Sequence, residues 1–292
     1  MNHEGYDSNG VWLCPIHGLR SDSDLDELLI TILTPEGTSH DFRLVSLSDD
    51  FKRKLEAALP HSHLTSFDVS QLSLGIRCET EASFGNEPVR VVGLWALSFA
   101  ISLGYDRISL SDCYLVKGGF QNSGIQSTGY EWAIQGRTTP NTLVVGEVPY
   151  FGFFARAVMH HSDRVTASVR RFYEAGKRAN FSDAVIDYVI TLDGLLNAYD
   201  AHKFAQRAVQ LVPPELSQKP DLETQIRALY LLRSQLVHGN FPQADRVLRS
   251  SFDGDIRIAS GFARTIATFV FQRVLREPKW LDRKAWHRRP PP

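Results

Sequence analysis

The chain has 292 residues, 43% of them hydrophobic and 22% charged, and a formal net charge of −1. This length predicts two domains, and the composition is that of a folded, soluble protein with a sizeable core. The near-zero net charge excludes a surface that coats nucleic acid wholesale, so any such contact would have to come from a local patch.

Cysteine usage and apolar runs predict a cytoplasmic protein. Cys14, Cys78 and Cys113 are few and scattered, which argues against a disulfide framework and favours a reducing compartment. Residues 1–5 lack the basic start and apolar segment of a signal peptide. The longest uncharged apolar run, Val91–Tyr105, is shorter than the roughly 20 residues that span a bilayer. We therefore expect no membrane contact.

The first half, residues 1–148, predicts an α+β domain. Runs of β-branched and aromatic residues bounded by turn formers indicate strands, and proline or glycine marks the ends of helices. The expected elements are a loose lead-in over residues 1–25, strands Glu27–Thr34 and Asp41–Leu47 in a hairpin, a helix Asp49–Leu59, one or two strands within Leu64–Glu79, a helix Val89–Leu103, and strands Ile108–Val116 and Thr142–Val148.

From Pro149 the apolar spacing becomes helical. Residues 149–278 predict an all-α domain, and residues 279–292 form a basic, proline-rich tail. The expected helices are Tyr150–His160, Asp163–Arg178, Ser182–Asp200, a continuation or restart at Ala201–Leu211, Asp221–His238 and Asp255–Arg276.

The helix Asp221–His238 carries an arginine inside its apolar row. Arg233 occupies the position between Leu229 and Leu236, where a charge needs an anionic partner to offset its desolvation. His238 follows in the last turn, where the helix dipole favours the imidazolium form, and Gly239 suits a left-handed helix end.

The helix Ser182–Asp200 carries the matching carboxylate. Asp193 borders its apolar face, which includes Val189 and Leu192. Opposite charges on facing apolar stripes are each other's most economical partners, so we predict a contact between Asp193 and Arg233. Such a pair serves either as a structural salt bridge or as part of a functional site, and the pattern leaves both uses open.

The stretch Arg233-Ser234-Gln235-Leu236-Val237-His238-Gly239 resembles the R-x4-H motif of HEPN domains, closest to the Apea-like branch. The stretch Val189–Leu196 is similar to the family's upstream apolar helix with its embedded acid. The resemblance covers roughly residues 160–276 and implies an up-and-down helical bundle.

The resemblance also implies an activity. Active HEPN proteins are metal-independent endoribonucleases, in which the RNA 2′-OH attacks the adjacent phosphorus and leaves 2′,3′-cyclic phosphate and 5′-OH ends. Carried over by motif, Arg233 would hold the phosphate and His238 would transfer protons. Because residues five apart on a helix are separated by roughly 140° and about 7.5 Å, one motif makes a poor closed site, and a homodimer with a composite site is expected. The implied role is a toxin or phage-defence effector, with an antitoxin or trigger protein as a possible partner.

Two departures from the family pattern motivate an alternative. Ser234 stands where many active relatives have Asn, Asp or His, and Asp193 stands for a glutamate and precedes Gly194. The alternative is a catalytically inactive HEPN module that dimerises and binds RNA or nucleotides. A scaffold in which the first half does the work is a third possibility.

Further cationic residues are candidates for RNA contact. Arg164, Arg171 and Arg178 repeat every seven residues, and this basic stripe suits an RNA backbone or a solvated helix face. The tail places Trp280 and Trp286 among basic residues, which suits base stacking, a docked tail or a disordered one. We predict no metal site and no cofactor.

Overall fold

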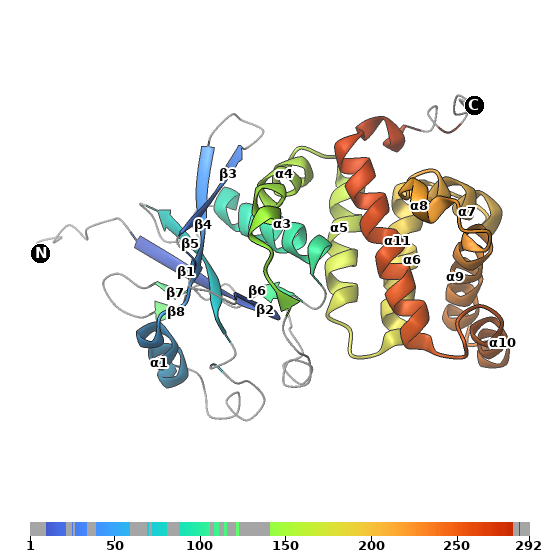
Figure 1. The fold of residues 1–292 in the computed structure, drawn as a ribbon, viewed down its shortest axis with the longest axis horizontal. Helices are drawn as coiled ribbons and strands as arrows, with labels where there is room; N and C mark the ends of the chain where they lie inside the picture. The colour runs from blue at the N-terminus through green and yellow to red at the C-terminus, as the bar shows by residue number, and fades with distance from the viewer. Residues whose placement is uncertain are drawn as a thin grey trace, which may run out of the picture. The chain divides into compact units, whose positions relative to one another are not determined.

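The computed structural model describes residues 10–21, 25, 27–33, 39–58, 69, 72–80, 88–105, 108–110, 114–115, 121–122, 141–282 and 286. The chain divides into two compact units, unit 1 at Met1–His160 and unit 2 at His161–Pro292. Unit 1 combines a mainly antiparallel sheet with helices, and unit 2 is helical (Figure 1). The predicted order, α+β followed by all-α, is confirmed at this level.

The main sheet of unit 1 has strand order β3-β4-β5-β1-β7-β8, with β6 also paired to β1. A second, two-stranded sheet pairs β2 with β9 in parallel. The strands are β1 Gly10–His17, β2 Leu19–Arg20, β3 Leu28–Leu33, β4 Ser39–Ser46, β5 Leu74–Thr80, β6 Ser109–Leu110, β7 Tyr114–Leu115, β8 Gln121–Asn122 and β9 Asn141–Thr142.

Strand β1 corrects the prediction of a loose lead-in over residues 1–25. It lies inside the sheet, paired with β5 from Gly10 to Ile16, with β7 at Trp12 and Leu13, and with β6 at Ile16 and His17. Pro15 cannot donate to a ladder, and it faces Gly75 on one side and the gap between the two short partner strands on the other. The polar residues and the proline masked an apolar strand that long-range pairing stabilises.

Helices cover both faces of the sheet. The face that includes Phe42 packs against α3, Pro88–Gly104, and α4, Val148–Met159, packs against both α3 and β3. Gly93 of α3 lies so close to Phe42 that a Cβ there would be 2.8 Å from its ring. The opposite face and α1, Asp49–Ala58, share a buried cluster. Its members are Leu13, Val45, Leu47, Phe51, Leu55, Val69 and Leu72.

Several other predicted elements of unit 1 are confirmed, and a second prediction is wrong. The strands β3 and β4 pair as expected, and the Ser48 hydroxyl caps α1 by accepting from the Phe51 amide at 3.2 Å. The strand predicted at Thr142–Val148 is wrong beyond Thr142, which ends β9. A 3-10 turn, η4 Val145–Glu147, leads instead into α4, because Pro149 favours the first turn of a helix. Residues 64–68 and most of the loop 117–141 lie outside the described residues.

The boundary between the units falls twelve residues after the predicted one. The helix α4 had been expected to open the helical domain, but its buried residues pack within unit 1. Cys14 is disulfide-bonded, although the few, scattered cysteines had argued against a disulfide framework.

Unit 2 is built from helices that follow one another closely. They are α5 Asp163–Gly176, α6 Phe181–Leu196, α7 Ala201–Val209, α8 Pro214–Ser217, α9 Leu222–Val237, α10 Phe241–Ser251, α11 Ile256–Arg276 and the 3-10 turn η5 Pro278–Leu281. α6 packs against α5, α9 and α11, and therefore occupies the centre of the unit (Figure 1). Among the described residues, no helix has the length and apolar character needed to cross a membrane.

Two features of unit 2 differ from expectation. The helix predicted at Ser182–Asp200 ends at Leu196, because Asn197 takes a left-handed conformation with φ of 50°. The next helix, α7, begins after Asp200, whose carboxylate caps it by accepting a hydrogen bond from the Lys203 amide at 2.8 Å. α8 and α10 had not been predicted. The apolar residues of α10 are few, and only Ala244 among them is buried.

Candidate functional site

A tight corner between α9 and α10 presents His238. The amide of Gly239 donates to the carbonyl of Leu236 at 3.1 Å, and the amide of Asn240 donates to that of Gln235 at 2.9 Å. With φ of 68° at Gly239, these bonds form a Schellman motif, which ends the helix in a defined geometry. The His238 side chain is exposed, and its backbone is fixed by this motif.

Arg233 lies one turn earlier, on the side of α9 that faces α6. Its side chain is half-buried, and its Nε is buried without a hydrogen-bond acceptor. Asp193 of α6 is near enough for its charge to interact with Arg233, yet its Oδ1 is also buried without a donor. No hydrogen bond or ion pair joins these two described residues. They are therefore electrostatic neighbours, and the predicted direct contact is not formed.

The pKa of Asp193 reflects this arrangement. Burial raises the pKa of its carboxyl, and the positive charge of Arg233 lowers it by less, so the net direction is upward. A carboxylate held by a hydrogen-bonded guanidinium would show the opposite direction. Asp193 is thus a partly desolvated acid beside a cation whose donors are not all used.

The two motif residues lie on different faces of α9. Helical geometry separates positions 233 and 238 by roughly 140°, and accordingly Arg233 is half-buried and His238 exposed. Ser234 is one turn before His238, and it is flanked on the helix surface by Leu231 and Val237, which are 43% and 50% exposed. These residues, Leu231, Ser234, Val237 and His238, define the α9 face. The face is uncharged when His238 is neutral, and it carries a small residue, Ser234, at its centre.

Two arginines complete the C-terminal end of α6, just beyond Asp193. Arg164 of α5 donates to the carbonyl oxygens of Gly194 and of Leu195, the latter at 2.6 Å. Arg207 of α7 donates to those of Leu196 and Asn197 at 2.8 and 2.7 Å. The last carbonyls of a helix have no partner within the helix, and a buried end needs donors from elsewhere. Arg164 therefore caps a helix, a role that the expected basic stripe did not include.

The other two arginines of the stripe bind a carboxylate that the sequence reading missed. Asp187 of α6 is 5% exposed and accepts from Arg171 at 2.7 Å and from Arg178 at 2.9 Å. Its hydrogen bond raises the pKa of Arg178. Lys177 is itself buried and paired with Glu174. The seven-residue repeat thus joins α5 to α6, and contact of these arginines with RNA stays a prediction.

Close packing between α5 and α6 explains why position 194 is a glycine. A Cβ at this position would lie 2.7 Å from the hydroxyl oxygen of Ser168, which is buried in α5. Thr191 adds a second contact between the two helices, because its hydroxyl donates to the Ser168 carbonyl at 3.4 Å. The glycine next to Asp193 therefore allows α5 and α6 to pack closely.

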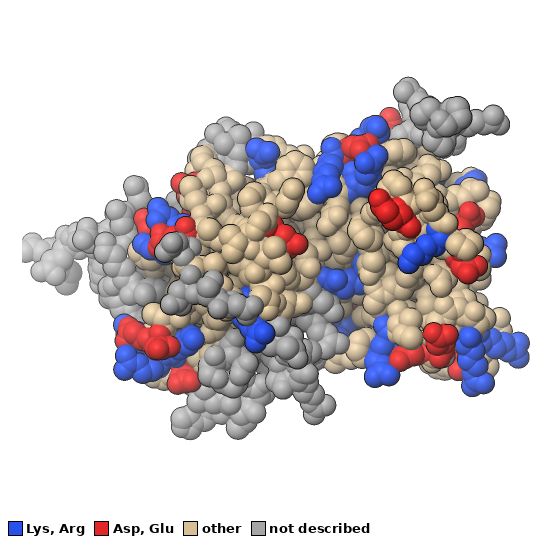
Figure 2. Space-filling model, in the orientation of Figure 1, with Lys and Arg blue, Asp and Glu red and all other residues tan. Residues whose placement is uncertain are grey.

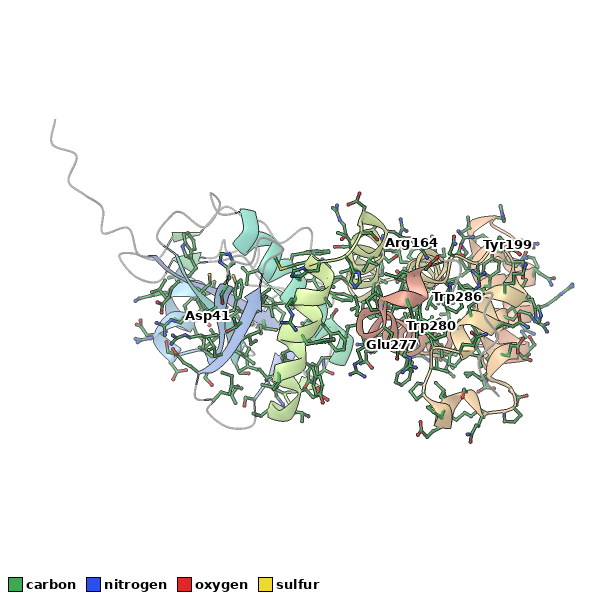
Figure 3. All side chains as sticks on the ribbon, turned by 90° about the horizontal axis from the view of Figure 1, so that it is seen from above. Asp41, Arg164, Tyr199, Glu277, Trp280 and Trp286 are labelled. Atoms are coloured by element: carbon green, nitrogen blue, oxygen red, sulfur yellow. The ribbon has the colours of Figure 1, made fainter. Side chains whose placement is uncertain are left out.

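The start of the tail is docked. Trp280 and Trp286 pack with ring centroids 5.2 Å apart, and the Arg207 guanidinium lies 5.1 Å from the Trp286 ring (Figure 3). Glu277 accepts from the Trp280 indole at 3.1 Å and pairs with Lys279 at 2.9 Å, which lowers the pKa of its carboxyl. The tryptophans thus pack against each other and cover a capping arginine.

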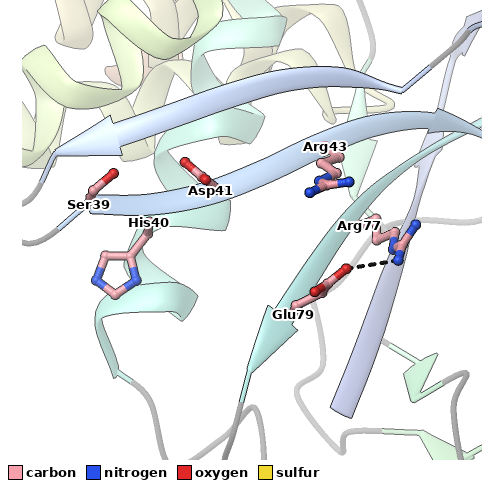
Figure 4. A pocket seen from close by; sticks show the side chains of 6 residues that line it. All are labelled: Ser39, His40, Asp41, Arg43, Arg77 and Glu79. Atoms are coloured by element: carbon pink, nitrogen blue, oxygen red, sulfur yellow. Dashed lines mark hydrogen bonds and ion pairs between the residues drawn. The ribbon is translucent and has the colours of Figure 1, made fainter. Parts of the chain in front are cut away.

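A polar pocket lies along strands β4 and β5 of the unit 1 sheet (Figure 4). It is lined by Ser39, His40, Asp41, Arg43, Arg77 and Glu79. Glu27 bridges Arg43 and Arg77, and Glu79 pairs with Arg77 at 2.8 Å. Both arginines of the pocket are therefore already paired with carboxylates.

The surface charges give no single basic platform on the face drawn in Figure 2, where lysines and arginines lie beside aspartates and glutamates. Within the described ranges, no three His, Cys, Asp or Glu side chains come together as a metal site. Comparison with protein-family models, curated proteins and solved structures finds no match. The site must therefore be interpreted from its own residues.

Proposed function

We propose that this chain is a metal-independent endoribonuclease of the HEPN type, in which Arg233 and His238 act on the RNA phosphodiester. The observation that carries the proposal is the corner at the end of α9. It fixes an exposed imidazole one turn after an arginine that is half-buried and that, among the described residues, forms no ion pair with a carboxylate.

The roles follow from the chemistry of each group. The guanidinium of Arg233 offers fork-shaped donors that suit a phosphate, and Asp193 supplies a compensating charge without occupying those donors. His238, exposed to solvent, accepts the proton of the ribose 2′-OH or returns one to the 5′ oxygen that leaves. Ser234 lies between them on α9 as an accessory hydroxyl.

A second copy of the chain completes this site. Cleavage needs both a proton acceptor and a proton donor, and one motif supplies a single histidine on a face turned away from its arginine. The α9 face suits a two-fold contact because exposed Leu231 and Val237 surround the small Ser234. The homodimer then presents two arginines and two histidines to one RNA strand. Unit 1 would sense a trigger or position the RNA, as befits a toxin or defence effector.

The test compares RNA cleavage by the wild type, Arg233→Ala and His238→Ala in the presence of EDTA. Arg227→Ala, an exposed arginine of α9, and His202→Ala, an exposed histidine of α7, are matched controls. We expect the two motif substitutions to abolish cleavage, the controls to retain it, and the products to carry 2′,3′-cyclic phosphate ends. Cleavage that survives both motif substitutions, or that EDTA stops, contradicts the proposal.

A second candidate is an inactive HEPN module that dimerises and binds RNA or nucleotides. The missing hydrogen bond between Asp193 and Arg233 favours it, because their relative positions are not fixed by a direct bond. Purified protein that binds RNA and leaves it intact under every trigger supports this candidate. Growth arrest on expression that His238→Ala relieves excludes it.

A further inference from the structure

Phe241 is exposed beside the proposed site. It is 67% exposed, the largest value among the large hydrophobic side chains of α9 and α10, and it follows His238 by three residues. Within the described part of the chain, no ring or cation packs against it. A phenylalanine is usually buried, so one held in solvent next to a reactive group has a face available for a ligand.

The backbone around Phe241 is held by hydrogen bonds from both helices. Asn240 donates its amide to Gln235 at the end of α9, and its carbonyl accepts from the Ala244 amide at 3.0 Å in the first turn of α10. Asn240 thus closes one helix and opens the next, and Pro242 fixes the backbone after Phe241. His238 and Phe241 therefore lie on either side of the same hydrogen-bonded corner.

We infer that Phe241 is the stacking platform for an unpaired nucleobase of the RNA whose phosphodiester reaches His238. This inference rests on the proposed function and names its substrate class, RNA that is single-stranded at the cleaved linkage. In RNA only one sugar separates a base from its phosphate. A strand whose phosphate lies at Arg233 and His238 therefore places a base close to these residues. Stacking on an aromatic ring requires an exposed base face, which a duplex does not offer.

Phe241 suits a base better than a second copy. The ring begins α10, beyond the last residue of α9, so it lies at the rim of the α9 face rather than between Leu231 and Val237. Base–aromatic stacking also tolerates every base, because each has a π face. The inference therefore concerns strandedness and makes no claim about sequence.

The experiment measures binding separately from cleavage. The probe is a single-stranded RNA oligonucleotide that carries one 2′-deoxy linkage, which cannot be cleaved, with 2-aminopurine beside it. The 2′-deoxy linkage replaces the one that wild type cuts in the all-ribose strand. If wild type cuts none, a central linkage is replaced. The proteins are full-length wild type, Phe241→Ala, Phe241→Trp and the control Ile258→Ala, whose side chain is 47% exposed on α11. We expect about tenfold weaker binding and lost 2-aminopurine quenching for Phe241→Ala. Phe241→Trp and Ile258→Ala should bind like wild type, and all four proteins should have the same oligomeric state.

Three results separate the possibilities. Equal affinity of Phe241→Ala and wild type overturns the inference, even if His238→Ala abolishes cleavage. Dissociation of Phe241→Ala into monomers identifies Phe241 as a subunit contact and also overturns it. If no RNA is cut but Phe241→Ala loses binding, the nuclease proposal fails and base stacking at Phe241 stands.

Discussion

Two aspartates of α6 should respond oppositely to the same substitution. Asp187 accepts two arginine hydrogen bonds at 2.7 and 2.9 Å, whereas Asp193 has a buried oxygen without a donor. Replacing each with asparagine removes the charge and keeps the shape. Asp187→Asn should lower the free energy of unfolding, and Asp193→Asn should leave it unchanged or raise it slightly.

The magnitude follows from the contacts. A hydrogen bond to a charged group contributes about 1.5–3 kcal/mol. Arg171 and Arg178 are 45% and 50% exposed, so water screens both bonds, and the asparagine oxygen still accepts one of them. We therefore expect a loss of about 2 kcal/mol for Asp187→Asn. For Asp193→Asn, the removed charge was costly to bury, and the gain is at most a few tenths of a kcal/mol because the site is only half-buried.

The assay is urea unfolding followed by circular dichroism, with midpoints compared at equal slope. Because burial raises the pKa of Asp193, its folded form binds a proton more readily than its unfolded form. Its contribution to stability is therefore present below the ordinary aspartate pKa and lost as pH rises through the raised value. Asp193→Asn should lack this loss. A decrease of more than about 1 kcal/mol on Asp193→Asn at pH 7 would refute the reasoning, since it indicates a direct bond to Arg233 in solution.

Three other predictions concern stability. Gly194→Ala should stabilise the protein by about 1 kcal/mol in a Ser168→Ala background but not in the wild type, because the added Cβ would lie 2.7 Å from the Ser168 hydroxyl oxygen. A double-mutant cycle measured by urea unfolding gives this coupling, and an equal gain in both backgrounds would contradict it. Arg164→Ala should lower the free energy of unfolding by about 2 kcal/mol and speed hydrogen exchange in the last turn of α6, because two partly buried carbonyls lose their donor. Arg164→Lys should recover only part of this loss, because an ammonium lacks the forked donors of a guanidinium. Burial lowers the pKa of His17 to about 3, so the NMR resonances of its ring should not shift between pH 5 and 8. Unit 1 should lose stability as pH falls below about 6.5, the ordinary histidine pKa. A titration midpoint near 6.5 for the His17 ring would show that the ring is hydrated.

The sequence determined the local features of unit 2. α9, its arginine within the apolar row and its left-handed Gly239 were all predicted, because each depends on residues three to five positions apart. α5 and α11 were likewise expected close to their observed bounds. In unit 1, the pairing of β3 with β4 was predicted from apolar runs on either side of a turn.

Tertiary structure alone decided which charges meet. The sequence paired Arg233 with Asp193, but the offset and rotation of the helices leave this pair without a bond and give Asp187 to Arg171 and Arg178. Ångström-scale displacements between packed helices settle such contacts, and no periodicity encodes them. The interior position of β1 has a similar cause. Its partner β5 lies some sixty residues later in the chain, and that pairing, rather than local preference, makes the segment a strand.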